Sequence, residues 1–94
     1  MIQMLCRNQV KNYAKWRKIF NADANAHRAA GLILKNVWRE KKSSNTVYFA
    51  FDVTDMRKAK AFINAPDAKE QAKRSGVVDG EYHFLESASL YKPA

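Results

Sequence analysis

Residues 46–53 alternate strictly between apolar and mixed side chains, and this alternation constrains the fold more than any other stretch of the chain. The odd positions hold Val47, Phe49, Phe51 and Val53, and the even ones hold Thr46, Tyr48, Ala50 and Asp52. Successive side chains of a β-strand point to opposite faces of the sheet. The odd positions therefore predict a face buried under helices. The even positions predict a face that meets a partner or a cavity.

The segments on either side of this strand predict an α+β chain in the order β-α-β-β-α-β. Further strands are expected over residues 1–7, 32–39 and 81–91. Two right-handed βαβ units in this order form the ferredoxin-like fold, a four-stranded antiparallel sheet with helices on one face. The other face is bare unless something packs on it, and a second copy of the chain is the expected cover.

Local signals mark where the expected helices begin and end. Asn12 is a suitable N-cap for a helix that runs to about residue 30, and Gly31 can adopt the left-handed conformation that ends it. Thr54 or Asp55 is expected to cap a second helix that ends at residue 63. Pro66 is expected to begin a further helix over residues 66–74.

Composition and charge limit the class of protein. The chain has 94 residues, which predicts a single domain over residues 1–94, and 47% of them are hydrophobic. Residues 1–47 hold ten Lys or Arg against two Asp or Glu, whereas residues 48–94 hold seven of each. Solvated helix faces account for this excess, so we expect no nucleic-acid partner. The single cysteine and the lack of a long apolar run predict a cytoplasmic protein without membrane contact.

One side of the first expected helix is lined with rings and ends in an imidazole. Its members, spaced three or four residues apart, are Tyr13, Trp16, Phe20, Ala24 and His27. Such a stripe can be ordinary core, or it can form the wall of a pocket for a flat apolar ligand.

Several further segments resemble small dimeric α/β-barrel proteins related to the antibiotic biosynthesis monooxygenases. The resemblance is carried by residues 10–16, Phe20, residues 27–31, residues 45–47 and 52–55, residues 58–62 and residues 75–78. It implies a homodimer whose two sheets face each other, with helices outside and a cavity between each sheet and its helices. It also implies a monooxygenase-like oxidation without cofactor or metal in some relatives, and haem degradation in others. The haem-degrading relatives use an Asn, a Trp and a His. Here Asn8, Trp38 and His27 are available, but no catalytic set carries over residue by residue.

The candidate site follows from the stripe. His27 is the candidate catalytic base or hydrogen-bonding group, and Asp23, four residues earlier, is its candidate orienting partner. Candidate ligand-binding residues are Tyr13, Trp16, Phe20, Trp38 and Tyr48. We predict a small aromatic or apolar ligand, no cofactor and no metal site. Whether the chain is an enzyme stays open, and the alternative is a non-enzymatic dimeric binding or stress-related protein whose stripe is only core.

Other residues have weaker signals. His83 shares a strand face with Glu81 and Leu85, and structural roles are favoured for it. Arg7 and Arg39 could hold an anionic group but are more typical of surface cations. Cys6 is expected to be an inert packed thiol. An RNA-recognition module remains a lesser alternative. Its base-stacking platform needs several rings on one open face, and the even positions of residues 46–53 supply only Tyr48.

Overall fold

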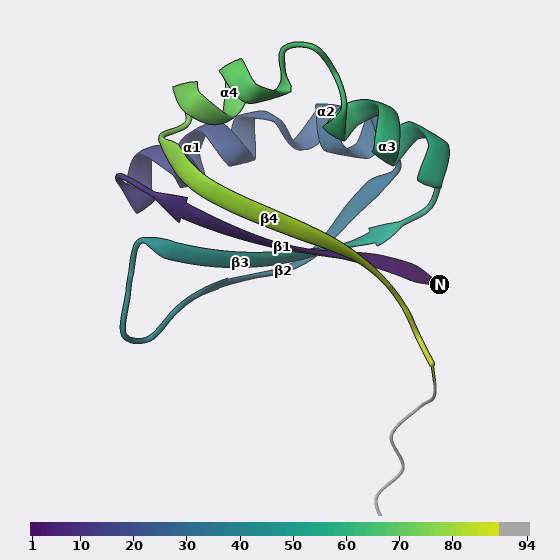
Figure 1. Ribbon diagram of the computed structural model, residues 1–94, viewed down its shortest axis with the longest axis horizontal. Coiled ribbons are helices and arrows are strands. Elements are labelled where there is room, and N and C mark those ends of the chain that lie inside the picture. Colours follow the sequence, from purple (N-terminus) through teal and green to yellow (C-terminus); the bar gives the residue numbers. More distant parts are fainter. Residues whose placement is uncertain (89–94) are drawn as a thin grey trace, which may run out of the picture.

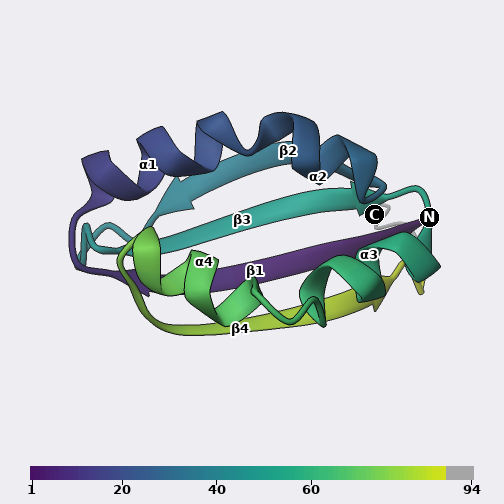
Figure 2. The same ribbon diagram turned by 90° about the horizontal axis from the view of Figure 1, so that it is seen from above.

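The computed structural model describes residues 1–88, and these residues form one sheet covered by helices on a single face (Figure 1). The elements in chain order are β1 (Ile2–Val10), α1 (Tyr13–Ala22), α2 (Ala24–Ala29), β2 (Leu32–Arg39), β3 (Thr46–Val53), α3 (Met56–Ile63), α4 (Ala68–Arg74) and β4 (Val77–Glu86). Seen from above, α1 and α2 run along one half of the sheet, and α3 and α4 run along the other (Figure 2).

The sheet has the order β2-β3-β1-β4, and every pair of neighbours is antiparallel. This arrangement is the predicted ferredoxin-like α+β fold. The four odd-numbered residues of β3 are buried at 7% exposure or less, and they form the core with Met4, Cys6 and the rings of α1. The alternation in residues 46–53 is thereby confirmed, because the helical layer covers one side of β3.

The predicted helix ends are largely confirmed. The Asn12 side chain accepts a hydrogen bond from the Lys15 N–H at 2.9 Å, and the Asp55 side chain accepts one from the Lys58 N–H at 3.0 Å. Gly31 has φ +75°, and a Cβ at this position would lie 3.0 Å from the backbone nitrogen of Asp55. Only glycine fits there without strain.

Two helix predictions are wrong in detail. The expected single helix over residues 12–30 is interrupted at Asp23, whose N–H is shared between the carbonyls of Ile19 and Phe20 at 3.1 and 3.2 Å. The shared bond tightens the last turn of α1, and α2 starts anew at Ala24. The expected helix start at Pro66 is also wrong, because a turn closed by the Ala68 N–H and the Ala65 carbonyl at 3.0 Å contains Pro66 and Asp67.

Two strands are longer than predicted. Strand β1 continues past residue 7, since Asn8 and Gln9 pair with Val47 and Thr46 although their polar side chains give no strand pattern. Strand β4 begins at Val77, four residues before the expected start, and its glycine at position 80 pairs with Asn8. The expected end of this strand at residue 91 lies outside the described residues.

A β-bulge in β2 decides which side chains face the helices. Leu34 pairs with Phe51, and the next paired residue is Asn36, which lies opposite Ala50. Lys35 is therefore an extra residue, and the alternation of inward and outward side chains changes phase after it. Val37 packs against the core, whereas Trp38 lies opposite Tyr48 on the uncovered face.

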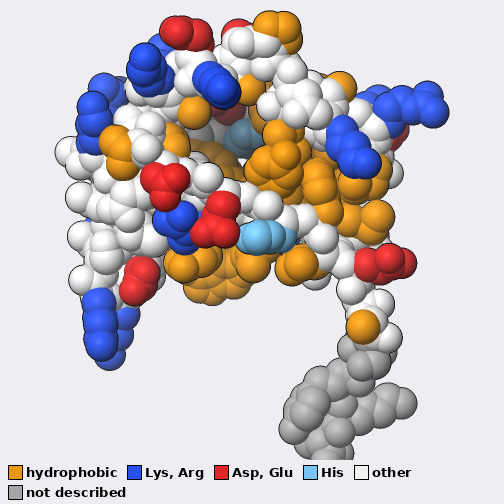
Figure 3. All heavy atoms as spheres, in the orientation of Figure 1, with side chains coloured by type: hydrophobic (Ala, Val, Ile, Leu, Met, Phe, Trp, Pro, Cys, Tyr) orange, Lys and Arg blue, Asp and Glu red, His pale blue; other side chains and the backbone are white. Residues whose placement is uncertain are grey.

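That uncovered face shows both apolar and charged side chains. Hydrophobic side chains gather beneath the sheet in the space-filling view (Figure 3). Among the large apolar residues on this side, Ile33 is 41% exposed, Trp38 46% and Leu85 45%. Over the described residues, no helix has the length and apolar character needed to cross a membrane.

Candidate functional site

His27 lies in α2 at the inner end of the aromatic stripe and is surrounded by phenylalanine rings. Its ring centroid is 4.9 Å from that of Phe20, 5.3 Å from Phe51 and 5.8 Å from Phe62. These rings come from α1, β3 and α3, so the fold itself assembles the surroundings of the imidazole.

The same surroundings set the protonation state of His27. Burial lowers its pKa from the ordinary 6.5, because a charged imidazolium loses hydration among apolar rings, and the negative charge of Asp23 opposes this only in part. The imidazole is therefore neutral at pH 7. Within residues 1–88, no side-chain hydrogen bond to the His27 ring is formed. The ring thus keeps a nitrogen lone pair that can accept a proton or a hydrogen bond.

Asp23 does not hold the imidazole through its carboxylate. The contact between the two residues is the helical bond from the His27 N–H to the Asp23 backbone carbonyl at 3.0 Å. Asp23 acts on the ring only through its charge. The geometry therefore contains a neutral base without an oriented Asp–His pair.

A pocket of about 210 Å³ opens beside His27, between the α1–α2 segment and edge strand β2. Its lining residues are Phe20, Asn21, Ala24, His27, Arg28, Leu32, Ile33 and Leu34. Apolar side chains form most of the wall, and Asn21, His27 and Arg28 supply the polar groups. This combination of an apolar wall with a few polar groups is typical of a small-molecule site.

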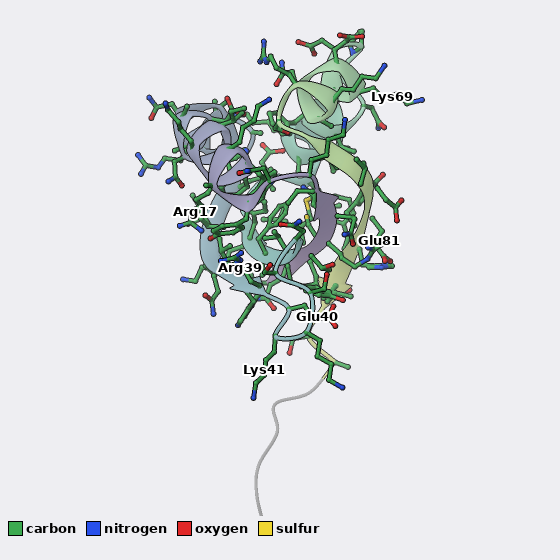
Figure 4. The ribbon with its side chains drawn as sticks, turned by 90° about the vertical axis from the view of Figure 1, so that its left-hand side faces the viewer. Arg17, Arg39, Glu40, Lys41, Lys69 and Glu81 are labelled. Carbon is green, nitrogen blue, oxygen red and sulfur yellow. The ribbon has the colours of Figure 1, made fainter. Side chains whose placement is uncertain are left out.

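The aromatic stripe divides into a core part and a pocket part. Trp16 is 2% exposed and stacks on Phe20 with ring centroids 4.7 Å apart, so it is core. Tyr13 lies beyond Trp16, and the Arg39 guanidinium sits 3.9 Å above the Tyr13 ring (Figure 4). Of the three rings proposed from sequence on this helix, only Phe20 lines the pocket.

Trp38 and Tyr48, the other two proposed ligand-binding residues, lie on the opposite face of the sheet from His27. The set of Asn8, Trp38 and His27 is not brought together either. Asn8 belongs to the helix-facing side of β1, and the bulge at Lys35 turns Trp38 away from it.

A separate ionic network lies on the uncovered face. Arg7 Nε donates to Glu81 at 2.6 Å, and Arg7 Nη2 contacts Asp79 at 3.1 Å. The other Glu81 oxygen lies 2.9 Å from His83 Nε2. Arg7 and the hydrogen bond from His83 lower the pKa of the Glu81 carboxyl. Arg7 and His83 therefore both have partners within the protein, as expected for structural residues.

Metal binding and thiol chemistry each require a particular set of side chains. Among the described residues, no group of three or more His, Cys, Asp or Glu could hold a metal ion. Cys6 is buried, and burial raises its pKa to about 12, which keeps the thiol protonated and unreactive.

Sequence reasoning missed several pocket residues. Arg28 and Asn21 fall outside the apolar stripe of the helix, and Leu32 and Leu34 come from a different element. The helical spacing gave no signal for them, because their position depends on how edge strand β2 meets α2.

Comparisons with known proteins bear on the fold. No protein-family model matches the chain, and no curated protein matches it by sequence. Solved structures do match. SnoaB, a cofactor-independent oxygenase from Streptomyces nogalater, is similar with a TM-score of 0.73 and 16% identity over 95% of this chain and 94% of that one.

Two further structures extend this likeness. A candidate antibiotic biosynthesis monooxygenase from Bordetella bronchiseptica has a TM-score of 0.73 and 15% identity over 94% of this chain and 97% of its own. An uncharacterized NIPSNAP domain protein from Burkholderia xenovorans has a TM-score of 0.67 and 15% identity over 99% and 100%. The chain therefore has the ferredoxin-like fold of the antibiotic biosynthesis monooxygenases. At these identities the likeness shows the fold alone.

Proposed function

We propose that the chain binds a small planar apolar ligand in the pocket beside His27, in a role like that of a cofactor-independent monooxygenase. The observation that carries the proposal is a neutral imidazole that opens toward the pocket and has no partner within residues 1–88. Among the described residues, no fully buried side-chain nitrogen or oxygen lacks a partner, so the imidazole nitrogens of His27 remain accessible from the pocket, where a ligand can hydrogen-bond to them.

The proposed chemistry is proton abstraction. A hydroxyl or an acidic C–H on the ligand would give its proton to the free nitrogen of His27, whose neutral form is the required base. The electron-rich anion left behind can give one electron to dioxygen, the co-reactant, and the two radicals combine to form a C–O bond. The resulting peroxide takes the proton back from His27 and then loses water, which leaves a carbonyl on the oxidised ring carbon. SnoaB, which is described as a cofactor-independent oxygenase, has the same fold and supports this reading by analogy only.

Binding can be tested with 2-naphthol and naphthalene, which differ only in the hydroxyl group. We expect the wild type to prefer 2-naphthol by about three- to tenfold, the worth of one neutral hydrogen bond. His27→Phe keeps an aromatic ring in place but removes the acceptor, so it should abolish this preference and leave naphthalene binding intact. Absence of saturable binding by both ligands, followed through naphthyl fluorescence, would contradict the proposal.

A second candidate is a binding protein without turnover. The missing hydrogen bond between the Asp23 carboxylate and His27 favours it, because an unoriented imidazole is a weaker catalyst. Oxygen uptake with 1,5-dihydroxynaphthalene separates the two candidates. Uptake that His27→Phe abolishes supports the oxygenase, and ligand binding without uptake supports the binding protein.

We also propose that the protein forms a homodimer through the uncovered face of its sheet. Ile33, Trp38 and Leu85 expose large apolar side chains there, and an open sheet face needs a cover. Trp38→Glu should therefore produce a monomer in sedimentation velocity. Tyr82→Glu is the matched control, because Tyr82 is also 46% exposed but pairs with Cys6 on the helix-facing side. A wild type that sediments as a monomer would overturn this proposal.

A further inference from the structure

The charge at the pocket beside His27 comes from Arg28. Arg28 follows His27 in α2, and its side chain is exposed and lines the pocket. Within residues 1–88 it forms no ion pair, whereas the cations Arg7 and Lys35 on the uncovered sheet face are both paired with carboxylates. No acidic residue belongs to the pocket lining. Asp23, whose charge partly offsets the lowering of the His27 pKa, lies outside this lining.

The polar groups of the pocket are arranged by depth. His27 is partly buried among the phenylalanine rings, whereas Asn21 and Arg28 are exposed. The apolar surfaces of Phe20, Leu32 and Leu34 belong to the same lining. A ligand that satisfies all these groups has an apolar ring and an anionic substituent near the mouth. A carboxylate matches the planar fork of a guanidinium.

The volume of the pocket limits the ring system. About 210 Å³ lies below the range of about 300–1,000 Å³ that is common for sites of drug-sized ligands. Trp16 and Phe51, each 2% exposed, close the space behind Phe20 and His27 with packed core, so the pocket cannot deepen without disrupting it. One or two fused rings fit this space.

We propose that the ligand of this site is an aryl carboxylate of one or two rings, with its carboxylate held by Arg28 and its ring against Phe20, Leu32 and Leu34. The proposal rests on the proposed function, because it assigns a ligand class to the same pocket. Arg28 is then the residue that determines specificity, and His27 faces the end of the ligand ring opposite the carboxylate.

The test compares 2-naphthoate with 2-naphthamide, which share one ring system and differ in charge. We expect the wild type to bind 2-naphthoate about fivefold more tightly, the scale of an ion pair at an exposed rim. Arg28→Gln should bring the two affinities together by weakening 2-naphthoate alone. High salt should do the same in the wild type, because exposed ion pairs are screened.

Two controls make the result specific. Lys18→Gln removes one exposed cation from α1 outside the pocket lining, and it should leave the preference unchanged. Arg28→Lys keeps the charge and should retain part of the preference. The three-ring 9-anthroate should not bind to the wild type.

The possible failures are distinguishable. If 2-naphthamide binds the wild type as tightly as 2-naphthoate, or if Arg28→Gln weakens both ligands equally, the assignment of Arg28 is wrong even though the pocket binds aromatic rings. Saturable binding of 9-anthroate to the wild type would overturn the limit on ring number. If neither 2-naphthol nor 2-naphthamide binds, the proposed function itself fails.

Discussion

His27→Phe is the substitution that best separates a ligand-facing imidazole from a structural one. The His27 ring contacts Phe20, Phe51 and Phe62 at centroid distances of 4.9 to 5.8 Å, so a phenylalanine ring at this position keeps aromatic neighbours on three sides. The pocket beside the ring gives the larger side chain room to adjust. The substitution therefore removes the imidazole nitrogens at little cost in packing.

The expected magnitude follows from the accessibility of the imidazole nitrogens. A fully buried polar group without a partner costs about 1–3 kcal/mol, but among the described residues no such atom exists, and the His27 nitrogens reach the pocket. We therefore expect His27→Phe to change the free energy of unfolding by less than about 1 kcal/mol near neutral pH. His27→Ala removes the ring contacts as well and should lower it by about 2 kcal/mol.

The pH dependence supplies an independent check. The pKa of His27 is lowered on folding, so in acid the unfolded chain binds the proton more readily than the folded one. The wild type should therefore lose stability as the pH falls below 6.5, until the folded imidazole itself is protonated. His27→Phe should lack this contribution, and the gap between the two proteins should widen in acid.

Urea unfolding followed by tryptophan fluorescence measures both effects, because Trp16 is buried in the fold. The titration should cover one pH unit on either side of 6.5. If His27→Phe destabilises the protein by as much as His27→Ala at neutral pH, the imidazole makes a structural hydrogen bond. That result would refute the reasoning, and with it the basis of the proposed site.

Two further predictions concern the fold. Gly31→Ala should lower the free energy of unfolding by about 2 kcal/mol and Gly76→Ala by about 1 kcal/mol, since both glycines have positive φ but only Gly31 is crowded by Asp55. Equal losses in urea unfolding would contradict this. Cys6 should resist iodoacetamide in the folded protein and react once urea unfolds it, because its pKa of about 12 leaves almost no thiolate. Mass spectrometry that finds rapid alkylation of the folded chain would show that β1 opens.

The parts of the fold that sequence predicted depend on interactions between near neighbours. A cap is formed by side chains and backbone within three residues, as at Asn12 and Asp55, so residue type alone predicts it. The interruption at Asp23 and the turn at Pro66 were missed, because each depends on how backbone bonds are shared along the turn.

Part of the candidate site was also predicted, again because it depends on residues that are near one another in the chain. The spacing of Phe20 and His27 places them on one face of the predicted helix, and both lie at the pocket although the structure divides this helix into α1 and α2. Trp38 was a further candidate for that site, and a regular strand would place it on the same face as Leu32 and Leu34. A single extra residue, Lys35, reverses the faces of the second half of β2, and no local pattern announces it.

By itself the sequence determined the order of elements, the buried face of β3 and the helix face that carries His27, since periodicity fixes which side chains point the same way. Only the tertiary structure decided what His27 meets. The phenylalanine rings that lower its pKa come from three elements, and Arg28 joins the site because α2 packs beside edge strand β2. These side chains belong to elements that lie far apart along the chain. The spacing of residues within one element does not determine how that element packs against another.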